Sequence, residues 1–174
     1  MQESDILSGK KVLIVDVESD VLETLEEMLS MCLIDKAHDF ASGRKFLDKG
    51  TYDAAILDIM GVRGYELLRL AAGRGIPVLM LTAHALSPDN LIQSIKEGAQ
   101  SYVPKDKLPD LPAFLRDMLE AHQKGTQKQA RWFSRLRPFF DKQFGPGWRE
   151  KDQEFWSDFD SKRAPSKKDL EEML

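Results

Sequence analysis

From residue 11 to residue 119, short apolar runs alternate with stretches of helical periodicity, and this alternation limits the folds that the chain can adopt. The apolar runs predict five strands, at residues 11–15, 33–38, 53–58, 77–82 and 101–103. Between and after them, apolar residues at helical spacing predict five helices, near residues 19–31, 44–47, 64–70, 88–97 and 111–119. Parallel strands need crossover connections, so the pattern predicts an α/β fold: a doubly wound five-stranded parallel sheet with helices on both faces.

The third apolar run ends on a single carboxylate. Residues 54–57 are Ala, Ala, Ile and Leu, and Asp58 follows them directly. A short run of this kind is typical of a buried strand in a parallel sheet. Open α/β sheets place their ligands at the carboxyl ends of the strands. Asp58 is therefore the first candidate for a functional residue.

Polar residues follow other predicted strands at the same edge. Asp16 and Glu18 follow the first strand, Thr82 ends the fourth, and Lys105 follows the fifth. Clustered carboxylates repel one another unless a cation joins them, and hard oxygen ligands suit Mg²⁺. A lysine and a hydroxyl nearby complete a cradle for a phosphoryl group, so the set predicts phosphoryl transfer onto Asp58 as nucleophile. Singly, an aspartate at a strand end also caps a turn, so the prediction depends on the whole set.

Four segments, taken in order, resemble the receiver domains of two-component response regulators. Residues 12–18 resemble the acidic motif of the first strand, and residues 52–60 resemble the strand that carries the phosphoacceptor. Residues 81–84 and 102–105 resemble the two switch segments. The resemblance covers residues 9 to 122, and it implies the flavodoxin-like receiver fold and a role in phosphorelay signal transduction.

The resemblance implies an acceptor and a metal site. Asp58 would take a phosphoryl group from a phosphohistidine and become an aspartyl phosphate. Mg²⁺ would be bound by Asp16, Asp58 and the backbone carbonyl of Met60, with Glu18 as a further ligand.

The resemblance also implies a switch and a set of partners. Thr82 would hydrogen-bond the phosphoryl oxygen, Lys105 would pair with the same group, and Tyr102 would change rotamer as Thr82 moves. The upstream partner would be a histidine kinase or a histidine phosphotransfer protein, and a downstream protein, which the sequence does not identify, would read the change. Such a chain is not an enzyme acting on others, since it promotes only its own phosphorylation and dephosphorylation.

The residue after Asp16 departs from the family pattern. Receiver domains usually place a second acidic residue directly after the first, and here that position is Val17. Only Asp16 and Glu18 then remain near the first strand to bind the metal. A competing hypothesis is therefore a pseudo-receiver, an interaction module that keeps the fold but is independent of phosphorylation.

Charge and composition suggest two parts. Residues 1–122 carry 13 Lys and Arg against 20 Asp and Glu, whereas residues 123–174 carry 12 against 9. This change of sign predicts a receiver domain at residues 1–122 and a C-terminal helical extension of unknown role at residues 123–174. The chain has one cysteine, Cys32, and no apolar run long enough to cross a bilayer, so we expect a cytoplasmic protein with no membrane contact.

The extension is rich in aromatic residues at helical spacing. They fall in two amphipathic segments, divided by Gly145-Pro146-Gly147, with a kink or restart expected near Arg137 because Pro138 follows it. A final short helix is predicted from Ser166. The aromatic residues need a cover, which the receiver or a second copy in a homodimer could provide. A groove for a partner helix and a DNA-binding role are alternatives, but acidic residues interrupt the basic ones and we do not expect nucleic acid as a partner.

Overall fold

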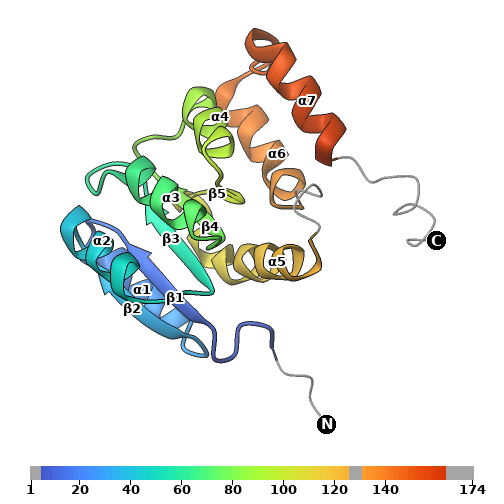
Figure 1. Ribbon diagram of the computed structural model, residues 1–174. Helices are drawn as coiled ribbons and strands as arrows, with labels where there is room; N and C mark the ends of the chain where they lie inside the picture. Colours follow the sequence, from blue (N-terminus) through green and yellow to red (C-terminus); the bar gives the residue numbers. More distant parts are fainter. Residues whose placement is uncertain (1–4, 126–130, 164–174) are drawn as a thin grey trace.

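The computed structural model describes residues 5–125 and 131–163 of the chain (Figure 1). One parallel sheet forms the centre, in the order β2-β1-β3-β4-β5. Its strands are β1 (Lys11–Val15), β2 (Leu33–Ala37), β3 (Ala54–Asp58), β4 (Val78–Thr82) and β5 (Ser101–Pro104). The predicted five-stranded, doubly wound parallel sheet is confirmed.

Helices follow the strands in alternation. The first five are α1 (Ser19–Met28), α2 (Phe40–Lys49), α3 (Gly64–Gly73), α4 (Pro88–Lys96) and α5 (Leu111–Lys124), with the short 3-10 helix η1 (Lys105–Asp110) before α5. From β1 the chain moves outward to β2 and then crosses back to β3, β4 and β5. Because such crossovers are right-handed, α1 lies on one face of the sheet and α2, α3 and α4 on the other.

Burial distinguishes the central strands from the edge strand β2. Every residue of β3 and β4 is buried, as the apolar runs predict. At the edge, Leu33 of β2 is 62% exposed, and Asp35 accepts a hydrogen bond of 2.7 Å from the Tyr52 hydroxyl. Charged residues within β2 are typical of an edge strand, since they discourage pairing with another chain.

The extension forms two helices, α6 (Arg131–Phe144) and α7 (Gln153–Arg163), with the 3-10 turn η2 (Glu150–Asp152) between them. Of the kink or restart expected near Arg137, the restart is wrong, because α6 continues through Pro138. Because proline has no N–H, the carbonyl of Ser134 lacks its helical hydrogen bond. Pro138 and Ser134 lie on the exposed side of α6, where water can replace that bond. The helix predicted from Ser166 lies outside the described residues.

The extension lies against the receiver at β5. Helix α6 contacts β5 and α5, and α7 lies beyond α6 at the end of the molecule away from β2 (Figure 1). All four residues of β5 are buried although β5 is an edge strand. Of the covers considered for the aromatic residues, the structure shows the receiver itself.

None of the helices in the described part of the chain combines the length and the apolar character that crossing a bilayer requires.

Gly64, the first residue of α3, lets the helix approach the end of β3. A Cβ atom built at Gly64 would lie 2.0 Å from the backbone oxygen of Asp58 and 2.7 Å from the Cα of Ile59. Backbone atoms cannot swing aside as a flexible side chain can. The absence of a side chain at Gly64 therefore helps to fix the position of Asp58.

We expect Gly64→Ala to destabilise the fold by roughly 1–3 kcal/mol or more, because the new methyl group must displace the backbone that carries Asp58. Gly73→Ala is a matched control in the same helix, since a Cβ at Gly73 meets nothing within 4 Å. That variant should be neutral or stabilising by up to about 1 kcal/mol. Urea unfolding followed by circular dichroism measures both, and equal stabilities would contradict the close approach.

Candidate functional site

The residues predicted from the strand ends meet at one edge of the sheet. β1 and β3 are neighbours at the point where the chain reverses its direction across the sheet. Asp16 follows β1 directly, and Asp58 is the last residue of β3. Open α/β sheets bind their ligands at this edge, where the strand order reverses. Asp16 and Asp58 lie there and are 1% and 4% exposed.

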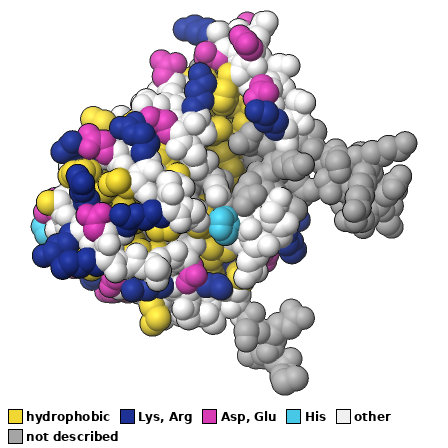
Figure 2. Space-filling view, in the orientation of Figure 1, with side chains coloured by type: hydrophobic (Ala, Val, Ile, Leu, Met, Phe, Trp, Pro, Cys, Tyr) yellow, Lys and Arg dark blue, Asp and Glu magenta, His cyan; other side chains and the backbone are white. Residues whose placement is uncertain are grey.

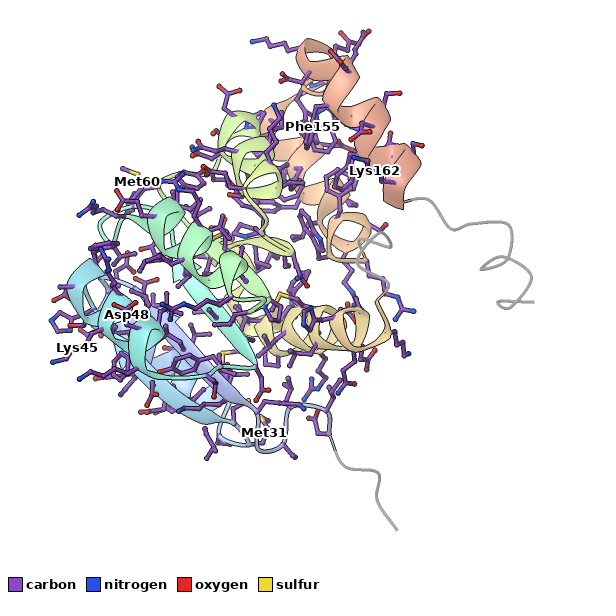
Figure 3. All side chains as sticks on the ribbon, viewed as in Figure 1. Met31, Lys45, Asp48, Met60, Phe155 and Lys162 are labelled. Atoms are coloured by element: carbon purple, nitrogen blue, oxygen red, sulfur yellow. The ribbon has the colours of Figure 1, made fainter. Side chains whose placement is uncertain are left out.

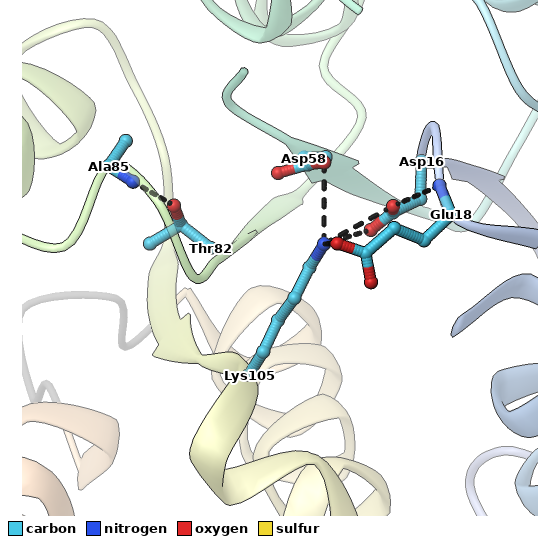
Figure 4. Close-up of polar contacts among 6 residues, drawn as sticks. All are labelled: Asp16, Glu18, Asp58, Thr82, Ala85 and Lys105. Atoms are coloured by element: carbon cyan, nitrogen blue, oxygen red, sulfur yellow. Dashed lines mark hydrogen bonds and ion pairs between the residues drawn. The ribbon is translucent and has the colours of Figure 1, made fainter. Parts of the chain in front are cut away.

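Lys105 connects the two carboxylates. Its side chain reaches from the end of β5 across the site (Figure 4), and its Nζ lies 3.0 Å from Asp16 Oδ2 and 3.4 Å from Asp58 Oδ2. Asp16 Oδ1 also accepts hydrogen bonds from Lys105 Nζ at 3.2 Å and from the backbone N–H of Glu18 at 2.9 Å. One ammonium group thus pairs with two buried carboxylates, and the cluster retains an excess of negative charge.

The charge imbalance changes the acidity of the cluster. Burial, with the charge of Asp16 adding to it, raises the pKa of Asp58 to about 6, and the ammonium of Lys105 offsets only part of this. Burial alone would lower the pKa of Lys105, but its hydrogen bond to Asp16 and the surrounding carboxylates outweigh burial and raise that pKa above its ordinary value. Lys105 is therefore a cation at neutral pH, and Asp58 is an unusually basic carboxylate.

Thr82 and Tyr102 are connected through one backbone segment. The Thr82 hydroxyl oxygen accepts a hydrogen bond of 3.0 Å from the N–H of Ala85, and the carbonyl of Ala85 accepts one of 2.9 Å from the Tyr102 hydroxyl. Thr82 and Tyr102 are both 0% exposed. In Figure 4 the Thr82 hydroxyl is hydrogen-bonded to Ala85, while Lys105 contacts the carboxylates of Asp16 and Asp58. Thr82 therefore lies at the site but is directed into the loop after β4.

The remaining predicted residues lie at the mouth of the site. Glu18 Oε1 is 3.6 Å from Lys105 Nζ, and the Glu18 side chain is 44% exposed. Met60 is 54% exposed, and its side chain points outward from the loop after β3 (Figure 3). Val17 is 47% exposed and lies against this loop, because a Cβ at Gly61 would be 2.6 Å from Val17 Cγ1.

The donor set suits a hard cation held by few protein ligands. Across residues 5–125 and 131–163, no three His, Cys, Asp or Glu side chains gather as a metal-binding group. Two buried carboxylates do converge, and Asp16 Oδ2 has no hydrogen-bond partner there, although the Lys105 ammonium is 3.0 Å away. A buried carboxylate oxygen without a hydrogen bond fits a divalent ion that keeps several of its waters, as Mg²⁺ does.

Two contributors to the site were missed from the sequence. Gly64 positions the end of β3. The sequence contained a signal for it, because glycine disfavours a helix and yet stands at the start of the predicted helix, six residues after Asp58. Ala85 connects Thr82 to Tyr102 through its backbone N–H and carbonyl, so its side chain carried no signal.

The fold and the site together define a doubly wound α/β protein with an acidic, lysine-bridged site at its switch point. The family model described as "Response regulator receiver domain" matches residues 12–116. The chain therefore belongs to the response regulator receiver domain family, which is a family of signalling proteins. The resemblance noted from the four motifs is confirmed.

Among curated proteins, the chain is similar to the transcriptional regulatory protein TcrA of Mycobacterium tuberculosis. The two are 36% identical over 121 residues, which is 63% of this chain and 46% of that protein. The chain spans about half the length, or less, of the curated relatives that it matches.

Solved structures share the fold. A CheY-like response regulator receiver domain protein from Methanospirillum hungatei is 26% identical with a TM-score of 0.62, over 68% of this chain and 99% of that one. A response regulator protein from Burkholderia pseudomallei, with a phosphorylated aspartic acid, calcium ion and citrate, is 20% identical with a TM-score of 0.58, over 70% of this chain and 73% of that one. The second likeness is one of fold alone.

The raised pKa of Asp58 predicts that its ionised form destabilises the fold. The folded protein holds the Asp58 proton more tightly than the unfolded chain does. Stability from this group is therefore complete below about pH 4 and is lost as the pH rises through about 6. With a chelator present to remove divalent ions, we expect Asp58→Asn to raise the free energy of unfolding at pH 7.5 above that of the parent chain by at most about 3 kcal/mol. This gain should vanish toward pH 4.

Thermal unfolding between pH 4 and pH 8 measures this difference. Asp106→Asn provides a control, because it removes an exposed carboxyl of η1, and the stability of this variant relative to the parent chain should be nearly constant across this range. A destabilised Asp58→Asn variant at pH 7.5 would contradict the electrostatic account.

Proposed function

We propose that this chain is a response regulator that accepts a phosphoryl group on Asp58 from the phosphohistidine of a histidine kinase or phosphotransfer protein. The observation that carries the proposal is the buried pair of Asp16 and Asp58 with Lys105 between them. A carboxylate that is buried, basic and next to a fixed cation is suited to attack phosphorus and to hold the product.

In the proposed reaction, an Asp58 carboxylate oxygen bonds to phosphorus while the bond from phosphorus to the histidine nitrogen breaks. The leaving nitrogen takes a proton from water, so the histidine leaves as neutral imidazole, and an acyl phosphate remains on Asp58. The Lys105 ammonium offsets the charge on the phosphoryl oxygens, and the Thr82 hydroxyl turns to donate a hydrogen bond to one of them. The chain thus promotes its own phosphorylation and, with water as acceptor, its own dephosphorylation.

We propose Mg²⁺ as the cofactor, held by Asp16, Asp58 and the Met60 backbone carbonyl, with Glu18 within reach. Bound there, the ion would supply positive charge for the phosphoryl oxygens during transfer. The likeness in fold to a protein with a phosphorylated aspartic acid and a calcium ion is consistent with a divalent cation at such a site.

The division of the chain and its setting are also proposals. We assign residues 1–122 to the receiver and residues 123–174 to the extension, while α5 itself continues to Lys124. The cytoplasm is the proposed location, because histidine kinases commonly deliver phosphate there and Cys32 is a free thiol.

A second candidate function is the phosphorylation-independent pseudo-receiver. It is favoured by Val17, an exposed apolar residue where the family usually has a metal-binding acid. A DNA-binding role has less support, since Arg135, Arg137 and Arg149 of the extension each pair with an aspartate, at 2.8, 3.0 and 2.7 Å.

We expect the chain to form a covalent phosphoadduct when it is incubated with Mg²⁺ and acetyl phosphate. Intact-mass spectrometry detects the added phosphoryl group, and Asp58→Asn should abolish it. Asp53→Asn, just before the opposite end of β3, should retain it, since that carboxylate accepts a hydrogen bond from the Lys11 backbone, well away from the site. An adduct that persists in Asp58→Asn would overturn the assignment of the acceptor.

We expect Val17→Asp to tighten Mg²⁺ binding on the order of tenfold or more, because a further carboxylate at the mouth adds about 2 kcal/mol of attraction to a divalent ion even in water. Val17→Asn provides the control of equal shape without charge. Isothermal titration with MgCl₂ gives both affinities, and equal values for the two variants would place Val17 outside the metal site.

A further inference from the structure

The extension covers the receiver through a continuous set of contacts at β5 and its neighbouring helices. The ring centres of Tyr102 and Phe140 lie 6.1 Å apart, and this contact joins β5 to α6. Lys107 Nζ lies 5.4 Å from the centre of the Phe139 ring, and Arg135 of α6 pairs with Asp117 of α5 at 2.8 Å. The receiver therefore meets α6 through both apolar and charged contacts.

Helix α7 reaches the receiver at α4. Lys96 Nζ lies 5.6 Å from the centre of the Phe155 ring, and Phe155 lies on the side of α7 that faces α4 (Figure 3). Hydrophobic side chains fill the space between α4 and α7, with Lys and Arg side chains beside them (Figure 2). The extension is thus packed on the receiver at both of its helices.

Phe140 is the centre of this packing. It is 0% exposed and contacts the rings of Phe133, Phe139, Phe144 and Trp148 as well as that of Tyr102. Aromatic residues of this size dominate the energy of an interface. A movement of the Tyr102 ring would therefore disturb Phe140, a fully buried residue of the extension.

A chain of direct contacts connects Phe140 to the acceptor site. The backbone N–H of Ala85 donates a hydrogen bond to the Thr82 hydroxyl, and the carbonyl of Ala85 accepts one from the Tyr102 hydroxyl. The Tyr102 ring in turn lies against Phe140. A Thr82 hydroxyl that turns toward a phosphoryl group on Asp58 pulls on Ala85 and on the acceptor of Tyr102. Close-packed interiors respond to such a shift by changing arrangement, since they are not continuously deformable.

We infer that residues 131–163 are the receiver's own output partner, docked on β5 through Phe140 and Tyr102, and that phosphorylation of Asp58 loosens this docking. This inference rests on the proposed function. The occupant of the β5 surface is the extension of the same chain, so an outside protein that recognises this surface must compete with α6 and α7. By reciprocity, if phosphorylation weakens docking by a given factor, the undocked chain favours the phosphorylated form by that same factor over the docked chain.

The chain carries its own probe for this test. All three tryptophans, Trp132, Trp148 and Trp156, lie in the extension, and they are 7%, 8% and 3% exposed. In the full chain with Mg²⁺, we expect acetyl phosphate to increase quenching of tryptophan fluorescence by acrylamide and to shift the emission to longer wavelength. Intact mass is measured on the same samples. No adduct on Asp58 would defeat the proposed function, whereas an adduct with unchanged fluorescence would defeat this inference alone.

A pair of Phe→Leu variants tests the route. Phe140→Leu should raise quenching before acetyl phosphate is added and tighten binding of the phosphoryl analogue beryllium fluoride by roughly fivefold or more. Phe144→Leu makes the same change one helical turn away, at a ring that stacks on Phe140 at 5.4 Å, and should keep the parent response. Equal responses in the two variants would overturn the route through Tyr102.

Tyr102→Phe keeps the ring against Phe140 but removes the hydrogen bond to Ala85. We expect this variant to show the parent quenching without acetyl phosphate and to lose the increase that follows phosphorylation, with the adduct measured in each sample. An unchanged increase would show that Tyr102 does not connect Asp58 to the extension. Because this variant leaves the aromatic packing in place, its result does not depend on whether Phe140→Leu folds.

Discussion

The site depends on two buried like charges that are held together by one cation. Asp16 and Asp58 are almost fully buried, and Lys105 is the ammonium that contacts both. An arrangement with two negative charges and one positive charge attracts a further cation and makes Asp58 more basic than an ordinary aspartate. The parallel sheet imposes this arrangement, because β1 and β3 end side by side and the residue after β5 can reach across to them. The electrostatics of the acceptor therefore follow from the strand order.

Much of this could be predicted from the sequence. The strand alternation gave the fold class, and residues at strand ends gave Asp16, Asp58, Thr82 and Lys105, because convergence at one edge is a general property of parallel sheets. Contacts made by backbone atoms, such as those of Ala85, have no counterpart in side-chain pattern. The continuous helix through Pro138 could not be predicted from the local sequence either, because tertiary packing decides which side of α6 is exposed.

The extension gives the receiver a surface unlike that of an isolated domain. Its aromatic residues were recognised as needing a cover, but periodicity does not say which partner provides it. The structure places Phe140 against Tyr102, so the residue expected to report on Thr82 lies under the extension and away from solvent. The resemblance to other receivers therefore describes the chemistry at Asp58 better than it describes what reads that chemistry.

The two edges of the sheet are protected in different ways. Charged residues within β2 protect that edge, whereas β5 is fully buried beneath its neighbours, among them α6. A protection that depends on a docked helix is reversible. If α6 leaves, the unpaired N–H and C=O groups along the outer side of β5 become accessible to another chain, and such exposed edges favour strand exchange and aggregation in general. Release of the extension thus carries a cost in colloidal stability, and this favours an arrangement in which release is brief or is followed at once by capture of another protein.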